Sequence, residues 1–358
     1  MLNTRSRKFV VKALRGALGF DLSGMDEPQE ILDDADVEAV ARVAVCNKVG
    51  GLIRVGARSV GLVIPARLDE ILKVDQSRAV AKNLVNLVET ERVLGILGNR
   101  LEVLVIKGPA RSSEVFGQLD CRASNDIDIL VRREDYDHAG HILCESGYRR
   151  GVSRDDRWWH QHLGESPFLP EKGHCTVDLH NKVQQPGGPS PRDLSMFFRN
   201  ARIVSVANRQ FAVPGPNEAL LLAYVSASKA MRSGEFWLGY AAEIAVSRAQ
   251  MSEAERIVFC DMSARQGLAR LVGYVDRVVD SIMACPRGEG IPPRSHDAIA
   301  DLASLPFGDG LTPARRFHRS RLIWQWVDGA GFKRMSAFVR HSAELMVSDM
   351  RRAPDQAA

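Results

Sequence analysis

The segment NDIDILV, Asn125–Val131, decides the fold of this chain. Its apolar positions predict a short buried β-strand. Side chains alternate between the two faces of a strand, so Asp126 and Asp128 project from one face and Ile127 and Ile129 from the other. Two carboxylates about 7 Å apart along one strand suit a divalent cation that prefers oxygen ligands. The segment therefore predicts an α/β core with a candidate metal site.

An Asp-X-Asp triplet also occurs as a solvated pair on exposed edge strands, but the upstream sequence favours chemistry. The apolar run Leu101–Ile106 predicts a strand, and Lys107, Gly108 and Pro109 follow it directly. Glycine permits a tight turn, and proline suits the first position of a helix. The free N–H groups of that helix would face an anion such as a nucleotide phosphate, and Lys107 would add a positive charge.

The downstream sequence supplies a third carboxylate. Thr176–His180 alternates apolar and polar residues, which predicts a half-buried strand with Asp178 and His180 on one face. Asp178 would complete a site for two metal ions if this strand lies beside the first one. We interpret His180 as a supporting or structural residue, because Mg²⁺ prefers oxygen ligands.

The surrounding patterns divide the chain into three parts: an N-terminal helical region over 1–98, an α/β core over 99–214 and a C-terminal helical domain over 215–358. In the first part, helices are predicted over Met1–Phe20, Asp36–Val55 and Ser77–Leu97. The core adds a helix over Glu134–Ser146, which Gly147 ends. Further helical patterns cover roughly 235–249, 251–266, 268–284, 294–304 and 312–345.

Composition limits the class of protein. The 358 residues carry a formal net charge of +4. Six widely spaced cysteines form no CxxC pair, which favours reduced thiols over a disulfide framework or a zinc ribbon. No apolar run approaches the roughly 20 residues that a membrane-spanning helix needs, and no secretory signal is present. We therefore expect a cytoplasmic protein without a membrane span.

The stretch VLVIKGPARSSEVFGQLDCRASNDIDILVRREDYDHAGHILCESGY, residues 103–148, resembles the uncharacterised bacterial nucleotidyltransferases of the DNA polymerase β superfamily. Their pattern is an apolar strand ending in Lys-Gly, a helix, an Arg, then Asp-Ile-Asp-Leu-Leu-Val and a helix ending in Gly-Tyr. The resemblance implies an α+β fold, a polymerase β-like core with a small mixed sheet, flanked by N- and C-terminal helical regions.

The same resemblance implies site residues. Asp126 and Asp128 would bind Mg²⁺ or Mn²⁺ together with a nucleoside triphosphate (NTP), and Asp178 would be the third metal ligand or the base for the attacking hydroxyl. The implied nucleotide-binding residues are Lys107, Gly108, Arg122 and Asn125, with the alternative that Arg122 pairs with a nearby acid. Glu243 takes the place of an Asp in the C-terminal helices, where Ser226, Ser228 and Lys229 also depart from the family pattern, so the sequence does not predict the acceptor.

The preferred hypothesis is a Mg²⁺-dependent enzyme that moves a nucleotidyl group from an NTP to a hydroxyl of an unknown acceptor, which is a peptide, a small molecule or tRNA. The alternatives are phosphoryl or glycosyl transfer from an activated nucleotide in the tailoring of a peptide or another secondary metabolite, a toxin that modifies tRNA or protein, and a non-catalytic scaffold.

Two other patterns have weaker interpretations. The segment RWWHQH at 157–162 predicts a packed lid, with base stacking on Trp158 or Trp159 as the alternative, and its histidines fit no standard zinc spacing. The Arg-rich segment RRFHRSR at 315–321, which precedes Trp324 and Trp326, predicts an amphipathic helix with a solvated basic face, with nucleic acid or a membrane surface as the alternative partner.

Overall fold

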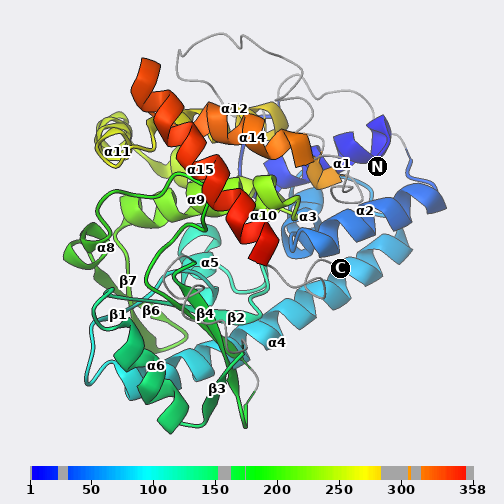
Figure 1. Ribbon diagram of the computed structural model, residues 1–358. Coiled ribbons are helices and arrows are strands. Elements are labelled where there is room, and N and C mark those ends of the chain that lie inside the picture. The colour runs from blue at the N-terminus through cyan, green and yellow to red at the C-terminus, as the bar shows by residue number, and fades with distance from the viewer. Residues whose placement is uncertain are drawn as a thin grey trace.

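A computed structural model describes residues 2–22, 31–151, 163–173, 175–283, 305–307 and 316–351 (Figure 1). The fold is α+β, as the sequence predicts, with a small mixed sheet at one end and helices around it. The helices before the sheet are α1 (Thr4–Ala17), α2 (Asp34–Cys46), α3 (Gly50–Ser59) and α4 (Ala66–Leu97).

The sheet has five strands in the order β1-β2-β5-β4-β3. They are β1 (Val103–Val105), β2 (Asp126–Val131), β3 (Tyr148–Arg150), β4 (Glu165–Pro170) and β5 (Thr176–His180). Strands β2 and β5 pair in parallel and place Asp128 opposite Asp178, whereas the other three pairs are antiparallel. The pairing of the two acidic strands confirms that they are neighbours. A separate hairpin is formed by β6 (Arg202–Val206) and β7 (Arg209–Val213).

The remaining helices lie within and after the sheet region. Within it are α5 (Pro109–Phe116), α6 (Tyr136–Glu145) and α8 (Ser195–Arg199). After it come α9 (Pro216–Ser233), α10 (Leu238–Gln250), α11 (Glu253–Arg265), α12 (Ala269–Met283), the 3₁₀ turn η1 (Leu305–Phe307), α14 (Arg316–Trp326) and α15 (Gly331–Arg351). The predicted pattern over 294–304 lies outside the described residues.

Two long predicted helices are wrong, because each is divided by a turn. The segment Asp36–Val55 breaks after Asn47, where Lys48 adopts a left-handed backbone with φ 55° and the N–H of Val49 donates to the carbonyl of Ala44. The segment 312–345 breaks between α14 and α15, at a turn that contains Gly329 with φ 108°. Apolar periodicity does not detect these turns, because it continues across them.

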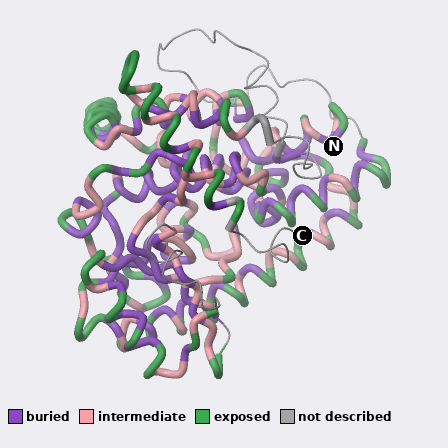
Figure 2. The backbone as a smooth tube through the Cα atoms, in the orientation of Figure 1, coloured by how far each residue is buried: buried purple, intermediate pink, exposed green. Residues whose placement is uncertain are grey.

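The two faces of the sheet belong to two apolar clusters. Ile127, Ile129 and Val177 face a cluster formed with α4, α6 and the β6–β7 hairpin. Leu130 faces the other cluster, which joins α1–α3 to α9–α12. The N- and C-terminal helical parts therefore share one core, and the buried segments run continuously through it (Figure 2). The domain boundaries stay a prediction.

Helix α3 crosses α1 at very short range through Gly56. A Cβ at this position would lie 1.8 Å from the carbonyl oxygen of Ala13. We expect Gly56→Ala to reduce the free energy of unfolding by about 2 kcal/mol, because the two backbones must separate. Gly95→Ala in exposed α4 is the matched control: a Cβ there meets nothing within 4 Å, and it should raise stability by up to about 1 kcal/mol. Urea unfolding measures both changes, and a Gly56→Ala protein as stable as the wild type would contradict the close crossing.

Candidate active site

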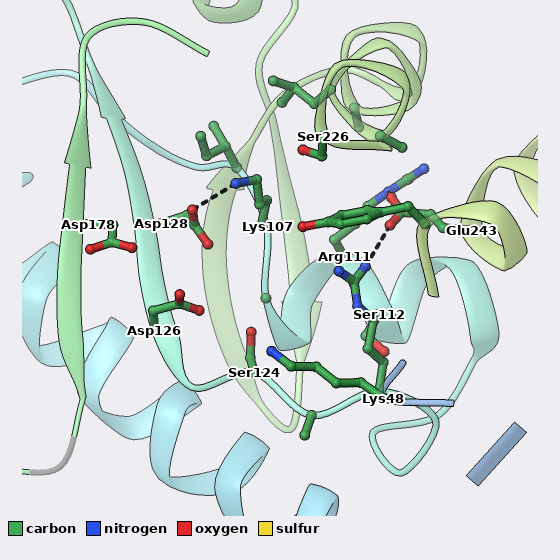
Figure 3. A pocket seen from close by; sticks show the side chains of 18 of the residues that line it. Lys48, Lys107, Arg111, Ser112, Ser124, Asp126, Asp128, Asp178, Ser226 and Glu243 are labelled. Carbon is green, nitrogen blue, oxygen red and sulfur yellow. Dashed lines mark hydrogen bonds and ion pairs between the residues drawn. The ribbon is translucent and has the colours of Figure 1, made fainter. Parts of the chain in front are cut away.

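Strands β2 and β5 bring the three predicted carboxylates into one pocket. Asp126, Asp128 and Asp178 all line a cavity of about 260 Å³, and they lie together on one side of it (Figure 3). The cavity is closed by α5, α9 and α10, and by the turn between α2 and α3. All three parts of the chain that the sequence predicts thus contribute to its walls.

Asp128 is the most enclosed of the three carboxylates. Asp128 is 6% exposed. Its Oδ1 atom accepts a hydrogen bond from Lys107 Nζ at 3.0 Å and lies 3.1 Å from His180 Nε2. Burial alone would raise the pKa of Asp128, but Lys107 and His180 outweigh it and hold this pKa well below its usual range. Lys107 therefore contacts a site carboxylate directly. His180 contacts the same Asp128 oxygen, which accords with the supporting role inferred for it from the sequence.

Asp126 and Asp178 have the opposite electrostatic character. Burial and the charge of Asp128 raise the pKa of Asp126, and the same two causes raise the pKa of Asp178 to about 7. At both carboxylates, burial and neighbouring acidic groups outweigh the nearby positive charges. Among the residues that the structure describes, no group of three or more His, Cys, Asp or Glu side chains stands in a metal-holding arrangement. The type of ligand nevertheless fits a hard divalent cation, which prefers carboxylate oxygens. A bound cation would also relieve the repulsion between the three carboxylates on these adjacent strands.

Glu165 on β4 is a fourth acidic residue of the pocket, and sequence reasoning missed it. Its Oε2 atom accepts a hydrogen bond from Lys229 Nζ at 3.1 Å. Burial raises its pKa, but Lys229, His180 and Lys107 outweigh this and hold it at about 2. The sequence gives little indication of this role. Strand β4 alternates half-buried and buried residues from Glu165 to Phe168, and the buried positions include the polar Ser166. Lys229 thus serves to neutralise Glu165 at this wall of the pocket.

The first turn of α5 forms the floor of the cavity. Gly108 has φ 85° and precedes the helix as its N-cap, and Pro109 is its first residue, as the sequence predicts. The N–H of Ser112 closes this turn on the carbonyl of Gly108. Ser112 lines the cavity and is 6% exposed, and its hydroxyl finds no hydrogen-bond partner among the residues that the structure describes.

A basic wall lies across the cavity from the carboxylates. Glu243 of α10 accepts hydrogen bonds from Arg111 Nε at 2.8 Å and from Arg122 Nη1 at 3.1 Å, and the Arg122 guanidinium lies over the Tyr240 ring at 4.1 Å. Arg122 therefore pairs with an acid, which was the alternative reading of this residue, while still lining the cavity. Arg111 and Tyr240 were not predicted. Ser226 also faces the cavity, whereas the Ser228 hydroxyl bonds to the carbonyl of Val225.

Buried asparagines of α4 fix the loop that enters β2. Asn83 Nδ2 donates to the carbonyls of Leu119 and Arg122, and Asn86 Nδ2 donates to the carbonyl of Asp126. Both asparagines are at most 1% exposed. They thereby set the position of the first site carboxylate from outside the sheet.

Asn125 is the predicted residue that the structure does not bring to the site. Its side chain is exposed, accepts a hydrogen bond from Lys82 Nζ at 2.9 Å, and is not part of the cavity wall. Asn125 precedes β2, in the loop that enters the strand, where its side chain is exposed. The segment 157–162 and His174 lie outside the described residues, as do Cys285 and Arg315. In α14, Trp326 is buried, which accords with a packed amphipathic helix.

Comparison with known proteins gives one family. The family model described as "Uncharacterised nucleotidyltransferase" matches residues 33–283, which is more than half of the chain and includes every residue of the cavity wall. None of the curated proteins and none of the solved structures matches the chain. Within the described residues, no helix is both long and apolar enough to cross a membrane.

Proposed function

Since the chain belongs to the uncharacterised nucleotidyltransferase family and is thus a transferase, we propose that it moves a nucleotidyl group from an NTP, with Mg²⁺ or Mn²⁺, to a hydroxyl of an acceptor. The observation that carries this proposal is the cluster of Asp126, Asp128 and Asp178 on two parallel strands, facing a cavity whose other wall is basic. Such a cavity suits a polyanion that arrives with a divalent cation.

Asp126 and Asp128 would hold the cation, and Asp178 would be its third ligand or the base for the attacking hydroxyl. When bound, the cation would neutralise charge on the α-phosphate and lower the pKa of the attacking hydroxyl. Lys107 lines the cavity and donates to Asp128 Oδ1, so we propose that this ammonium moves to a phosphate oxygen when cation and NTP bind. His180 would keep the Asp128 carboxylate oriented throughout, because it is buried, contacts the same Oδ1 atom and is not part of the cavity wall.

The chain's own groups can complete the transfer. The acceptor oxygen forms a bond to the α-phosphorus, the bond from that phosphorus to the bridging oxygen breaks, and pyrophosphate leaves with the electron pair. As the base, Asp178 would accept the hydroxyl proton, since it lines the cavity beside Asp128, and burial and the charge of Asp128 raise its pKa to about 7. The first turn of α5 would face the phosphates with its free N–H groups.

The test is thermal stability with each NTP, with and without Mg²⁺. A ligand that binds only the native state raises the free energy of unfolding by about 2.7 kcal/mol at a hundredfold excess over Kd. We expect a Mg²⁺-dependent shift for the wild-type protein and none for the Asp126→Asn/Asp128→Asn double variant. Absence of a shift with every NTP would contradict the proposed donor.

Labelled donors distinguish the type of transfer. Label in the α-phosphate of the NTP must reach the acceptor if a nucleotidyl group moves. Label that reaches the acceptor only from the γ-phosphate would establish phosphoryl transfer instead, and label from a nucleotide sugar would establish glycosyl transfer. Each of these two results would overturn nucleotidyl transfer while keeping the cavity as the active site.

A further inference from the structure

The turn between α2 and α3 holds Lys48 in an unfavourable backbone conformation. Lys48 follows the C-cap of α2 with φ 55°, a left-handed position that glycine adopts without strain. The turn is fixed by Asn47, whose side chain donates to the carbonyls of Val43 and Pro306 and accepts from the N–H of Leu238 at the start of α10. A strained residue that its surroundings hold in place points to a role for its side chain.

Lys48 is also the cavity-lining cation that makes no close ion pair within the described residues, although its charge acts on Asp126 and lowers the pKa of that carboxyl. Five cationic side chains line the cavity, and four of them have partners: Lys107 bonds Asp128, Lys229 bonds Glu165, and Arg111 and Arg122 share Glu243. Across the described part of the chain, the Lys48 ammonium makes no hydrogen bond or ion pair. The Lys48 side chain extends toward Ser124, which also lines the cavity (Figure 3).

Ser112 is a second unsatisfied group on the wall of the same cavity. Ser112 lies in the first turn of α5 and is almost completely buried, and within the described part of the chain its hydroxyl has no hydrogen-bond partner. The helix N-terminus around it adds positive potential. A donor hydroxyl, a helix N-terminus and an unpaired ammonium together suit an anion with several oxygens, such as a phosphate group.

The position of Lys48 and Ser112 relative to the carboxylates indicates which phosphates of the NTP they would bind. Asp178 lies at one side of the cavity, Lys48 and Ser112 lie at the other, and Asp126 lies between them (Figure 3). In-line displacement places the attacking oxygen and the leaving group on opposite sides of the phosphorus. From this arrangement we infer that Lys48 and Ser112 bind the β- and γ-phosphates of the NTP and hold the pyrophosphate leaving group. This inference rests on the proposed nucleotidyl transfer.

The variant Lys48→Gly distinguishes phosphate binding by Lys48 from a purely structural role of this residue. Glycine removes the ammonium and relieves the left-handed backbone, so the melting temperature should rise by roughly 2 °C while binding weakens. We expect the Kd for pyrophosphate with Mg²⁺, measured by calorimetry, to increase roughly tenfold or more, since a charge-assisted hydrogen bond is lost. The KM for the NTP should rise with it. Lys48→Met, which keeps the side-chain length, should weaken binding equally without the gain in stability.

Two controls complete the design. Ala207 has φ 49° in the β6–β7 turn, so Ala207→Gly should also raise the melting temperature but leave pyrophosphate binding unchanged. Lys73→Met removes an exposed lysine of α4 that is not part of this cavity. Unchanged pyrophosphate and NTP binding in both Lys48 variants would overturn the inference and leave nucleotidyl transfer standing. Pyrophosphate binding that depends on Lys48, in a protein that binds no NTP, would retain the anion site and overturn nucleotidyl transfer.

Discussion

Asp128→Asn is expected to abolish turnover and to destabilise the protein, whereas Asp126→Asn should abolish turnover alone. Loss of either carboxylate should reduce kcat by roughly 10³-fold or more if both hold the cation. The stabilities differ because the partners differ. Asp128 neutralises the Lys107 ammonium and contacts His180, and its amide would leave that partly buried cation without its hydrogen-bonded counter-charge. We expect this to cost about 2–3 kcal/mol.

Among the described residues, no side chain forms a hydrogen bond or ion pair with Asp126, and burial and the charge of Asp128 raise its pKa although Lys107 and Lys48 oppose this. Removing its charge relieves repulsion in the metal-free protein, so the melting temperature of Asp126→Asn should equal or exceed that of the wild type. Urea unfolding without metal, combined with single-turnover kinetics with Mg²⁺ and NTP, measures both effects. Equal stability of the two variants would show that the Lys107–Asp128 pair contributes nothing, and full activity of either one would exclude its role as a ligand.

The acidic strands could be predicted from the sequence because their signal is local. The alternation around Asp126 and Asp128 specifies a strand and its faces, and the Gly108-Pro109 turn specifies where α5 begins. The family resemblance added the pairing with Asp178, which alternation alone does not give. The structure then placed Asp128 and Asp178 at the same register of a parallel pair.

The remaining walls of the cavity depend on long-range packing, which periodicity does not report. Glu165 pairs with Lys229, and Arg111 pairs with Glu243. Both partners lie in helices far along the chain, so the local sequence does not show these contacts. Lys48 sits in a stretch whose apolar spacing reads as continuous helix, so the turn that presents it was missed. Asn83 was likewise hidden, because a polar residue on a helix is expected to face solvent, yet it binds the loop before β2.

Glu243→Gln is expected to lower the free energy of unfolding by about 3 kcal/mol, which makes it the largest stability effect among these variants. Glu243 is 5% exposed, and its two oxygens serve Arg111 of α5 and Arg122 of the loop before β2. It therefore ties the C-terminal helices to the α/β core. The glutamine amide keeps one oxygen acceptor, but its N–H donors face the second guanidinium. That largely buried cation then lacks its counter-charge.

The matched control is Glu91→Gln, which removes the same charge from an exposed pair with Arg209. Exposed pairs contribute about 0–1 kcal/mol, so this variant should remain close to the wild type. A double-mutant cycle with Arg122→Gln measures the coupling directly, because the cost of Glu243→Gln should fall once that guanidinium is gone. Additive losses in the cycle, or equal losses for Glu243→Gln and Glu91→Gln, would show that Glu243 is not the bridge. The bridge matters for function because it fixes the basic wall opposite the carboxylates: α10 carries Tyr240 as well as Glu243, so loosening it should also raise the KM for the NTP.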